Sequence, residues 1–231
     1  MARSIKHTEI FKAIHRSQHC QRNWDLSKQI PEEDLELIKE AGTQCPSKQN
    51  ISYFRLHFIT NREIIEKVHG YTTGAIMWDT PGPLGGFNPD GKSYTNPQTL
   101  ANLLIVFERK TIAEINDSST GVPRNGEVFE KESGQLDEDT LRDLERDANV
   151  ALGISAGYIN LVSSLLGYST GCCQCMEPKA IRDVIGMKNV PALLMGVGFK
   201  NPELNRRIHH ADHSVMFSTN KKQTMEVFDI E

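Results

Sequence analysis

The sequence has little net charge and no long run of one charge sign. Its 26 basic and 30 acidic side chains leave a formal net charge of −4 over 231 residues. The basic patch of a nucleic-acid-binding protein would raise the basic share, so we expect no nucleic-acid partner. Internal repeats and low-complexity tracts are also absent. The length allows one large domain or two small ones.

Cysteine is scarce and unevenly spaced. The chain has five cysteines, an odd number, and three of them crowd into Cys172, Cys173 and Cys175. A secreted disulfide framework spaces its cysteines differently. The N-terminal residues are polar and lack the apolar core of a signal peptide. We therefore expect reduced thiols and a cytoplasmic location.

Metal and dinucleotide motifs are weak or missing. No HExxH zinc motif occurs, and the CxxC at 172–175 has no second CxxC to complete a zinc site. Three interpretations of that CxxC stay open: a redox pair, a zinc site completed by His209, His210 and His213, or a plain tight loop. Gly196-Val197-Gly198 lacks the third glycine of a dinucleotide fingerprint, which favours close packing at a strand end.

The longest stretch without a formal charge is 148–176, which holds 29 residues. Small and apolar residues fill its first two-thirds, which predicts a long helix over 139–167. A Gly/Ser/Thr/Cys loop is expected after Gly167. The stretch also carries Asn and Ser side chains that are costly in lipid, so we expect a buried helix rather than a membrane span.

The remaining elements follow from periodicity and from helix and strand end signals. Helices are expected near 8–20, 31–44, 61–70 and 177–186, and strands over 53–60, 103–107 and 190–199. Two polar, turn-rich segments, 77–96 and 110–138, are predicted insertions. Helices mixed with few strands indicate an α+β or α/β domain.

No polar loop pairs a nucleophile with a matched base. The loops at 18–24, 45–50 and 205–207 offer cations, hydroxyls and amides instead. Such groups suit a flat, phosphorylated cofactor that carries the chemistry itself. On the residues alone, Arg206 and Arg207 could equally be a solvated surface pair.

Three segments resemble the FMN-dependent nitroreductase family. They are Arg22-Asn23-Trp24-Asp25, Ile30-Pro31-Glu32-Glu33 and Cys45-Pro46-Ser47-Lys48-Gln49-Asn50. The 148–176 stretch resembles the long dimer-core helix of that family and its glycine-rich loop over the flavin. The resemblance implies a single α+β domain over 1–231, in which a mixed or antiparallel sheet lies between layers of helices. It also implies that the long helix lies at a homodimer interface.

Twelve positions match or adjoin the cofactor site of the family. They are Gln18, His19, Cys20, Arg22, Ser47, Asn50, Asn96, Cys173, Gln174, Cys175, Arg206 and Arg207. Arg22 falls on the ring-side base, where a cation favours the reduced flavin. The phosphate-side arginine and serine of the family fall on Gln18 and Cys20, and Arg16 is an alternative if the helix holds an insertion.

The other positions match flavin contacts of several kinds. Ser47 and Asn50 match flavin-edge and ribityl contacts that are often made across the dimer. Asn96 approximates a ring contact, and Gln174 is expected to present its backbone N–H to the flavin. Arg207 is the better match to the C-terminal arginine of the family.

The function implied is an FMN-dependent oxidoreductase that transfers hydride from NAD(P)H to a small acceptor such as a nitroaromatic or a quinone. The flavin would carry the chemistry, without a catalytic side chain or a metal. One alternative is a flavoenzyme of the same fold that catalyses reductive dehalogenation or flavin breakdown. Another is a non-enzymatic binding module stabilised by a Cys/His metal site.

Overall fold

The structure is a computed structural model that describes residues 5–73, 95–112, 114–115, 138–206, 208 and 225–230. Most of the two predicted insertions, 77–96 and 110–138, lies outside the described residues. The insertion predictions therefore stay predictions.

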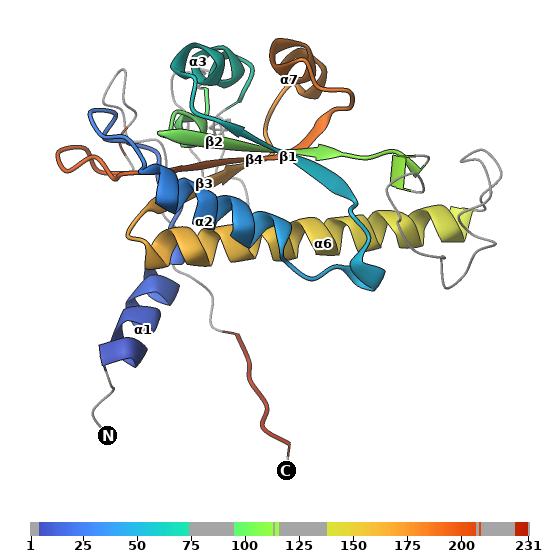
Figure 1. The fold of residues 1–231 in the computed structure, drawn as a ribbon, viewed down its shortest axis with the longest axis horizontal. Helices are drawn as coiled ribbons and strands as arrows, with labels where there is room; N and C mark the ends of the chain where they lie inside the picture. Colours follow the sequence, from blue (N-terminus) through green and yellow to red (C-terminus); the bar gives the residue numbers. More distant parts are fainter. Residues whose placement is uncertain are drawn as a thin grey trace, which may run out of the picture.

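A four-stranded antiparallel sheet forms the centre of the described fold (Figure 1). Its strands are β1 (Phe54–Ile59), β2 (Leu103–Arg109), β3 (Ser169–Cys173) and β4 (Pro191–Gly198), in the order β1-β2-β4-β3. Every strand pair is antiparallel. The sequence left open a mixed or an antiparallel sheet, and the structure has the antiparallel one.

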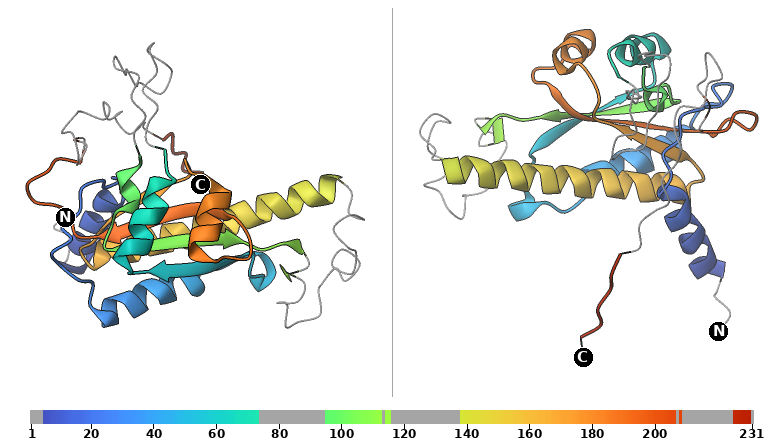
Figure 2. Two further views of the ribbon diagram at one scale, coloured as in Figure 1. Left: turned by 90° about the horizontal axis from the view of Figure 1, so that it is seen from above. Right: turned by 180° about the vertical axis from the view of Figure 1, so that it is seen from behind.

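Helices cover both faces of the sheet, which gives three layers (Figures 1 and 2). The α-helices are α1 (Ile5–Ser17), α2 (Glu32–Thr43), α3 (Arg62–Gly70), α6 (Glu138–Leu165) and α7 (Pro178–Ile185). The 3₁₀ turns are η1 (Lys48–Asn50) and η2 (Pro97–Thr99). α2 and α6 pack on one face of the sheet, and α3 and α7 lie side by side on the other. This α+β architecture agrees with the predicted fold class.

Strand β2 lies at the centre of both cores. Leu103, Ile105 and Phe107 point to the α2 and α6 layer, while Leu104 and Val106 point to α3 and α7. All five side chains are fully buried. A continuous apolar run is what a strand buried on both faces requires, so the prediction for 103–107 is confirmed.

The predicted loop after Gly167 is wrong over residues 169–173, which form strand β3. Gly167 ends the helix in the left-handed region at φ 98°, and the chain then pairs with β4. The segment has the polar, glycine-containing composition of a loop, and its extended conformation comes from hydrogen bonding to β4. Loop geometry is left to Gln174 and Cys175, which follow the strand.

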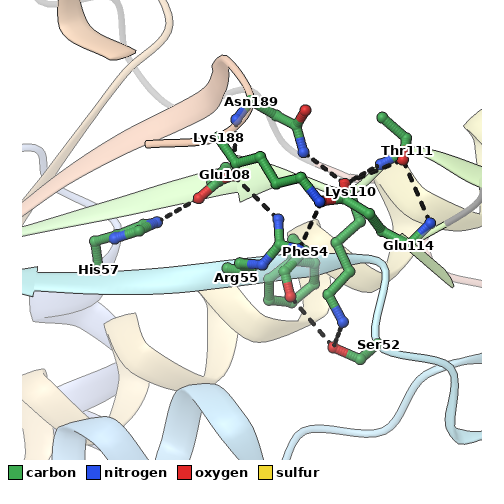
Figure 3. A network of polar contacts seen from close by, with 10 residues as sticks. All are labelled: Ser52, Phe54, Arg55, His57, Glu108, Lys110, Thr111, Glu114, Lys188 and Asn189. Carbon is green, nitrogen blue, oxygen red and sulfur yellow. Dashed lines mark hydrogen bonds and ion pairs between the residues drawn. The ribbon is translucent and has the colours of Figure 1, made fainter. Parts of the chain in front are cut away.

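A charge network around two buried carboxylates, Glu108 and Glu114, ties the β1–β2 edge to the start of β4 (Figure 3). The Glu108 side chain is 1% exposed and accepts from Arg55 at 3.0 Å and from the backbone N–H of Asn189 at 2.8 Å, while His57 Nε2 lies 2.6 Å from it. Glu114 is bound by Lys188 at 2.7 Å. The charges compensate each other, which lets them lie on the sheet.

We predict that Glu114→Gln lowers stability most near neutral pH. The Lys188 ammonium and the Arg55 guanidinium hold the pKa of Glu114 well below its usual range. Because the pKa of Glu114 is lower in the folded state than its unfolded value of 4.5, the ionised carboxylate stabilises the fold at pH values above 4.5. This stabilisation is lost as the pH falls below 4.5 toward the folded pKa. We expect a loss of about 1–3 kcal/mol at pH 7 that shrinks steadily below pH ~4.5.

Urea unfolding at several pH values measures this difference. Glu9→Gln is the matched control, because Glu9 is also ion-paired, to Lys12 at 2.8 Å, but both side chains are about 60% exposed. The control should change stability by less than about 0.5 kcal/mol. A Glu114 effect that does not change between pH 7 and pH 3 would contradict the proposed cause.

Candidate functional site

Arg22 lies where the N-terminal segment crosses the open end of the sheet. Cys20 forms a parallel bridge with Thr170 of β3, and Gln21 N–H donates to Thr170 O at 2.7 Å. The Arg22 guanidinium contacts Cys20 O at 3.5 Å. Burial is the main factor that lowers the pKa of Arg22. The site therefore contains a partly buried cation beside β3.

Gln98 is the residue of this site that the sequence prediction missed. With its amide nitrogen donating to Cys172 O at 2.5 Å, its amide oxygen accepts from Arg22 Nη2 at 3.2 Å. The side chain is 4% exposed. Gln98 thus orients the Arg22 guanidinium through a neutral oxygen, a contact that does not neutralise the charge.

A pair of facing glycines makes room for Gln98. Gly171 of β3 and Gly196 of β4 are register partners. A Cβ atom at Gly171 would lie 3.1 Å from Gln98 Cβ, and one at Gly196 would lie 2.1 Å from Gln98 O. Any side chain at Gly196 would collide with the backbone of η2. The GxG at 196–198 is therefore a packing feature, as the sequence predicted.

Asn96 and Trp24 hold η2 in place. The Asn96 side chain accepts from Gln98 N–H at 3.1 Å and contacts the thiol of Cys173. Trp24 is 6% exposed and donates from Nε1 to Pro97 O at 2.9 Å. Asn96, which the sequence predicts as a ring contact, is the residue that caps the 3₁₀ turn.

The cysteines at the end of β3 are held as neutral thiols. Desolvation by neighbouring protein atoms, and then Cys20 and Cys173, raise the pKa of the Cys172 thiol, although Cys172 is an exposed residue. Desolvation also raises the pKa of Cys173, whose thiol contacts Cys175 O at 3.4 Å. Thiolates are the reactive and metal-binding form, so these thiols are poor candidates for redox or zinc chemistry.

No three His, Cys, Asp or Glu side chains gather as a metal site within the described part of the chain. His209, His210 and His213, which the zinc alternative needs, lie outside the described residues. The described cysteines therefore give that alternative no support.

The phosphate-side candidates differ in what their side chains contact. Arg16 Nη1 donates to Ser164 O at 2.7 Å and Gln18 Nε2 to His15 O at 3.0 Å, so both side chains bind helix carbonyls. His19 is exposed and lies within the electrostatic influence of Arg206. Arg207, predicted as the C-terminal arginine of the site, lies outside the described residues.

Ser47 and Asn50 lie far from Arg22 in the same chain. Their neighbour Lys48 pairs with Asp147 at 2.5 Å, whereas Ser17 O near Arg22 accepts from Asn160 at 2.9 Å. Thirteen residues of α6 separate these anchors, or about 20 Å of helix. One chain therefore does not bring the two predicted groups together.

The 45–50 segment nevertheless borders a cavity of about 640 Å³ between the end of α2 and β1. Ser47 and Asn50 both line it, beside Phe54 and Leu56 of β1. Gln49 and Asn50 have φ of 57°, in the left-handed region, which asparagine tolerates but which costs Gln49 energy. Strain of this kind at a cavity marks the segment as a candidate contact surface.

Two short sequence patterns match enzyme motifs but do not lie in the structural context that the motifs require. Gly153–Gly157 has the pattern GxSxG, yet it lies within α6, and its Ser155 is fully buried and donates to Gly42 O at 2.9 Å. Residues 86–93 have the pattern GxxxxGKS and lie outside the described residues. A phosphate loop opens a helix at once, but residues 95 and 96 are not helical and a three-residue 3₁₀ turn follows.

Known proteins are similar to this chain in sequence and in fold. The model of the nitroreductase family matches residues 16–199, so the chain belongs to the nitroreductase family. A Staphylococcus saprophyticus protein named "Putative NAD(P)H nitroreductase" is 24% identical over 132 residues, 57% of this chain and 52% of that protein. The matched region thus spans about half the length of that relative.

Solved structures agree with the fold. A nitroreductase with bound FMN from Bacteroides fragilis superposes with a TM-score of 0.56 at 16% identity, covering 96% of this chain and 99% of that one. A nitroreductase family protein from Streptococcus pneumoniae has a TM-score of 0.57 at 14% identity and covers 84% and 92% of the two chains. The predicted three-layer architecture is therefore that of the family.

Proposed function

We propose that this chain is an FMN-dependent oxidoreductase that uses NAD(P)H to reduce a small acceptor such as a nitroaromatic or a quinone. The observation that carries the proposal is the convergence of Arg22, Gln98 and the end of β3 in a nitroreductase fold. These groups come from three distant parts of the sequence and meet at one end of the sheet. FMN, when bound, supplies the hydride chemistry.

The residues present fit FMN. The isoalloxazine edge needs a donor that stabilises negative charge, and Arg22, oriented by Gln98, is a partly buried cation of that kind. The phosphate needs cationic or N–H donors, which His19 and Arg206 can supply. The exposed Gln174 and Cys175 after β3 offer backbone groups toward the ring.

A homodimer is part of the proposal, because α6 exposes an apolar stripe. Val150, Tyr158, Leu161 and Leu165 are 55%, 47%, 37% and 48% exposed. They recur at helical spacing on one side, and only 33% of the most apolar window of α6 is buried within the chain. A second copy of α6 is the partner that this stripe suits.

An antiparallel pair of α6 helices would also complete the site. A two-fold axis near the middle of α6 carries the start of one helix to the end of the other. Ser47 and Asn50, beside Asp147, would then approach the partner subunit near its Arg22 site. This geometry accounts for two groups of site residues that lie about 20 Å apart along the helix in one chain.

The C-terminal residues 225–230 also lack a surface to pack on within the described chain. Met225, Val227, Phe228 and Ile230 are between 74% and 95% exposed, and the segment extends away from the sheet on the α6 side (Figure 1). Extended apolar residues favour a partner surface, and the second subunit is the nearest candidate.

We propose a cytoplasmic location because the cysteines are reduced. All five cysteines are free in the structure, and none of the described residues forms a disulfide. Reduced thiols are typical of a reducing compartment. Fractionation of the source cells, with antibodies against this chain, tests the location.

An absorbance spectrum of the purified protein tests the function. We expect the two visible bands of oxidised flavin, uptake of added FMN at about one per chain, and NAD(P)H oxidation that depends on a nitroaromatic or quinone. Parallel assays with a halogenated phenol separate nitro reduction from dehalogenation. A colourless protein that takes up no FMN would rule the proposal out.

A further inference from the structure

The side chain of Gln98 joins two segments that are distant in the sequence. When its amide nitrogen faces Cys172 O at 2.5 Å, its amide oxygen faces Arg22 Nη2 at 3.2 Å, so both neighbours gain a suitable partner. The reverse orientation places oxygen against oxygen and nitrogen against nitrogen. Gln98 is 4% exposed, so water competes little for either contact. One planar amide therefore sets the position of the Arg22 guanidinium relative to strand β3.

The turn that carries Gln98 is itself held by three contacts. Trp24 Nε1 donates to Pro97 O at 2.9 Å, and the Asn96 side chain accepts from Gln98 N–H at 3.1 Å. The backbone N–H of Asn96 donates to Thr72 Oγ1 at 2.9 Å. Because these contacts fix the backbone of the turn, the amide of Gln98 is preorganised for its two partners.

Gln98 also holds the end of β3. Its partner Cys172 is the last residue but one of that strand. Beyond the strand, Cys175 O accepts from Thr73 N–H at 2.9 Å. Gln174 therefore lies between two anchored carbonyl groups, and Gln98 anchors one of them. The proposed function assigns this segment and the arginine to the same flavin ring.

The oxygen that Gln98 offers to the guanidinium is neutral. A carboxylate at this position would bring a negative charge beside Arg22 and offset its positive charge. An amide oxygen orients the guanidinium through a hydrogen bond and leaves its charge available to a ligand. The chemistry of the contact thus suits a residue that places a cation without weakening it.

We propose that Gln98 is a positioning residue for flavin reduction, which acts by holding the Arg22 guanidinium at a fixed place relative to the end of β3. The inference rests on the proposed function, in which hydride from NAD(P)H reduces bound FMN. Negative charge develops on the ring in that step, and a cation that is already in place stabilises it without reorganisation. Gln98 acts through Arg22 and not through a contact with the flavin.

Gln98→Met tests the inference, because methionine has a similar length and removes both polar contacts. We expect NAD(P)H to reduce the bound flavin about tenfold more slowly. We also expect the affinity for reduced flavin, relative to oxidised flavin, to fall about tenfold, which makes the two-electron midpoint potential about 30 mV more negative. Stopped-flow absorbance measures the rate, and a spectroelectrochemical titration measures the potential.

A double-mutant cycle shows whether Gln98 acts through Arg22. In the Arg22→Ala background, Gln98→Met should change the rate and the relative affinity by less than about twofold, because no guanidinium is left to hold. Urea unfolding of the four apoproteins should show the same coupling without flavin, as a smaller loss of stability from Gln98→Met in the Arg22→Ala background. Equal effects of Gln98→Met in both backgrounds would overturn the inference.

Gln21→Met is the matched control for the loss of a buried amide. Gln21 is also 4% exposed, but its Oε1 accepts from the main-chain N–H groups of Arg22 at 2.9 Å and Asn23 at 3.2 Å. We expect this variant to lose stability and to keep the midpoint potential of the wild type. A potential shift as large as that of Gln98→Met would overturn the inference, since loosening of the segment would then explain both. A wild-type protein that takes up no flavin would overturn the proposed function, and this inference with it.

Discussion

Leu161→Glu is expected to convert the protein from a dimer to a monomer and to empty its flavin sites. Leu161 lies in the middle of the exposed stripe on α6, so in the proposed dimer its side chain is buried against the second copy. A carboxylate placed there without a partner costs about 3 kcal/mol or more per side, or about 6 kcal/mol per dimer, which weakens association by about 10,000-fold. Light scattering after gel filtration measures the mass, and absorbance measures the flavin retained.

Leu141→Glu is the matched control for this prediction. Leu141 is on the same helix and is 38% exposed, against 37% for Leu161. It lies about 160° around the helix from Leu161, within the charged first turns. We expect the control to remain dimeric and yellow. A Leu161→Glu protein that stays dimeric and keeps FMN would show that the stripe is not the interface.

The periodic, apolar parts of the fold could be predicted from sequence, and the parts held by tertiary packing could not. Residues 103–107 and the long helix α6 have apolar patterns that indicate a buried strand and a long helix directly. Strand β3 was missed because its residue composition is typical of a loop. The segment is extended because it pairs with β4. Local composition does not indicate which distant segment will pair with a strand.

In the candidate site, too, some residues could be predicted from local sequence and others depend on tertiary packing. Arg22 was found through a resemblance in its neighbouring residues, and Trp24 through its apolar character. Gln98 had no signal of its own, since a glutamine before a strand resembles any surface residue. The facing glycines Gly171 and Gly196 were the available clue, because such pairs mark close approach of another backbone. Conversely, the GxxxxGKS pattern at 86–93 would suggest a phosphate loop if the 3₁₀ turn that follows it in place of an α-helix were not known.

Arg22→Ala is expected to slow reduction of the bound flavin by about 100-fold while changing the free energy of unfolding by only about 1 kcal/mol. The proposed role of Arg22 is to stabilise negative charge that develops on reduction, so its loss affects the transition state most. The contacts that folding loses include those with Gln98 and Cys20 O. Anaerobic stopped-flow mixing with NAD(P)H measures the reduction rate, and urea unfolding measures stability.

Arg62→Ala should give the opposite result. Arg62 is also a desolvated arginine with a lowered pKa, and its Nη1 donates to Leu100 O at 3.1 Å and Ala101 O at 3.2 Å. It lies at the start of α3, on the face of the sheet away from α6, so its removal should cost about 1–3 kcal/mol of stability with little change in the reduction rate. Arg22→Lys, which keeps the charge but not the fork geometry, should fall between wild type and Arg22→Ala in rate. An Arg22→Ala protein that is reduced as fast as the wild type would remove Arg22 from the ring-side role, since electrostatic stabilisation at that edge is the one function assigned to its charge.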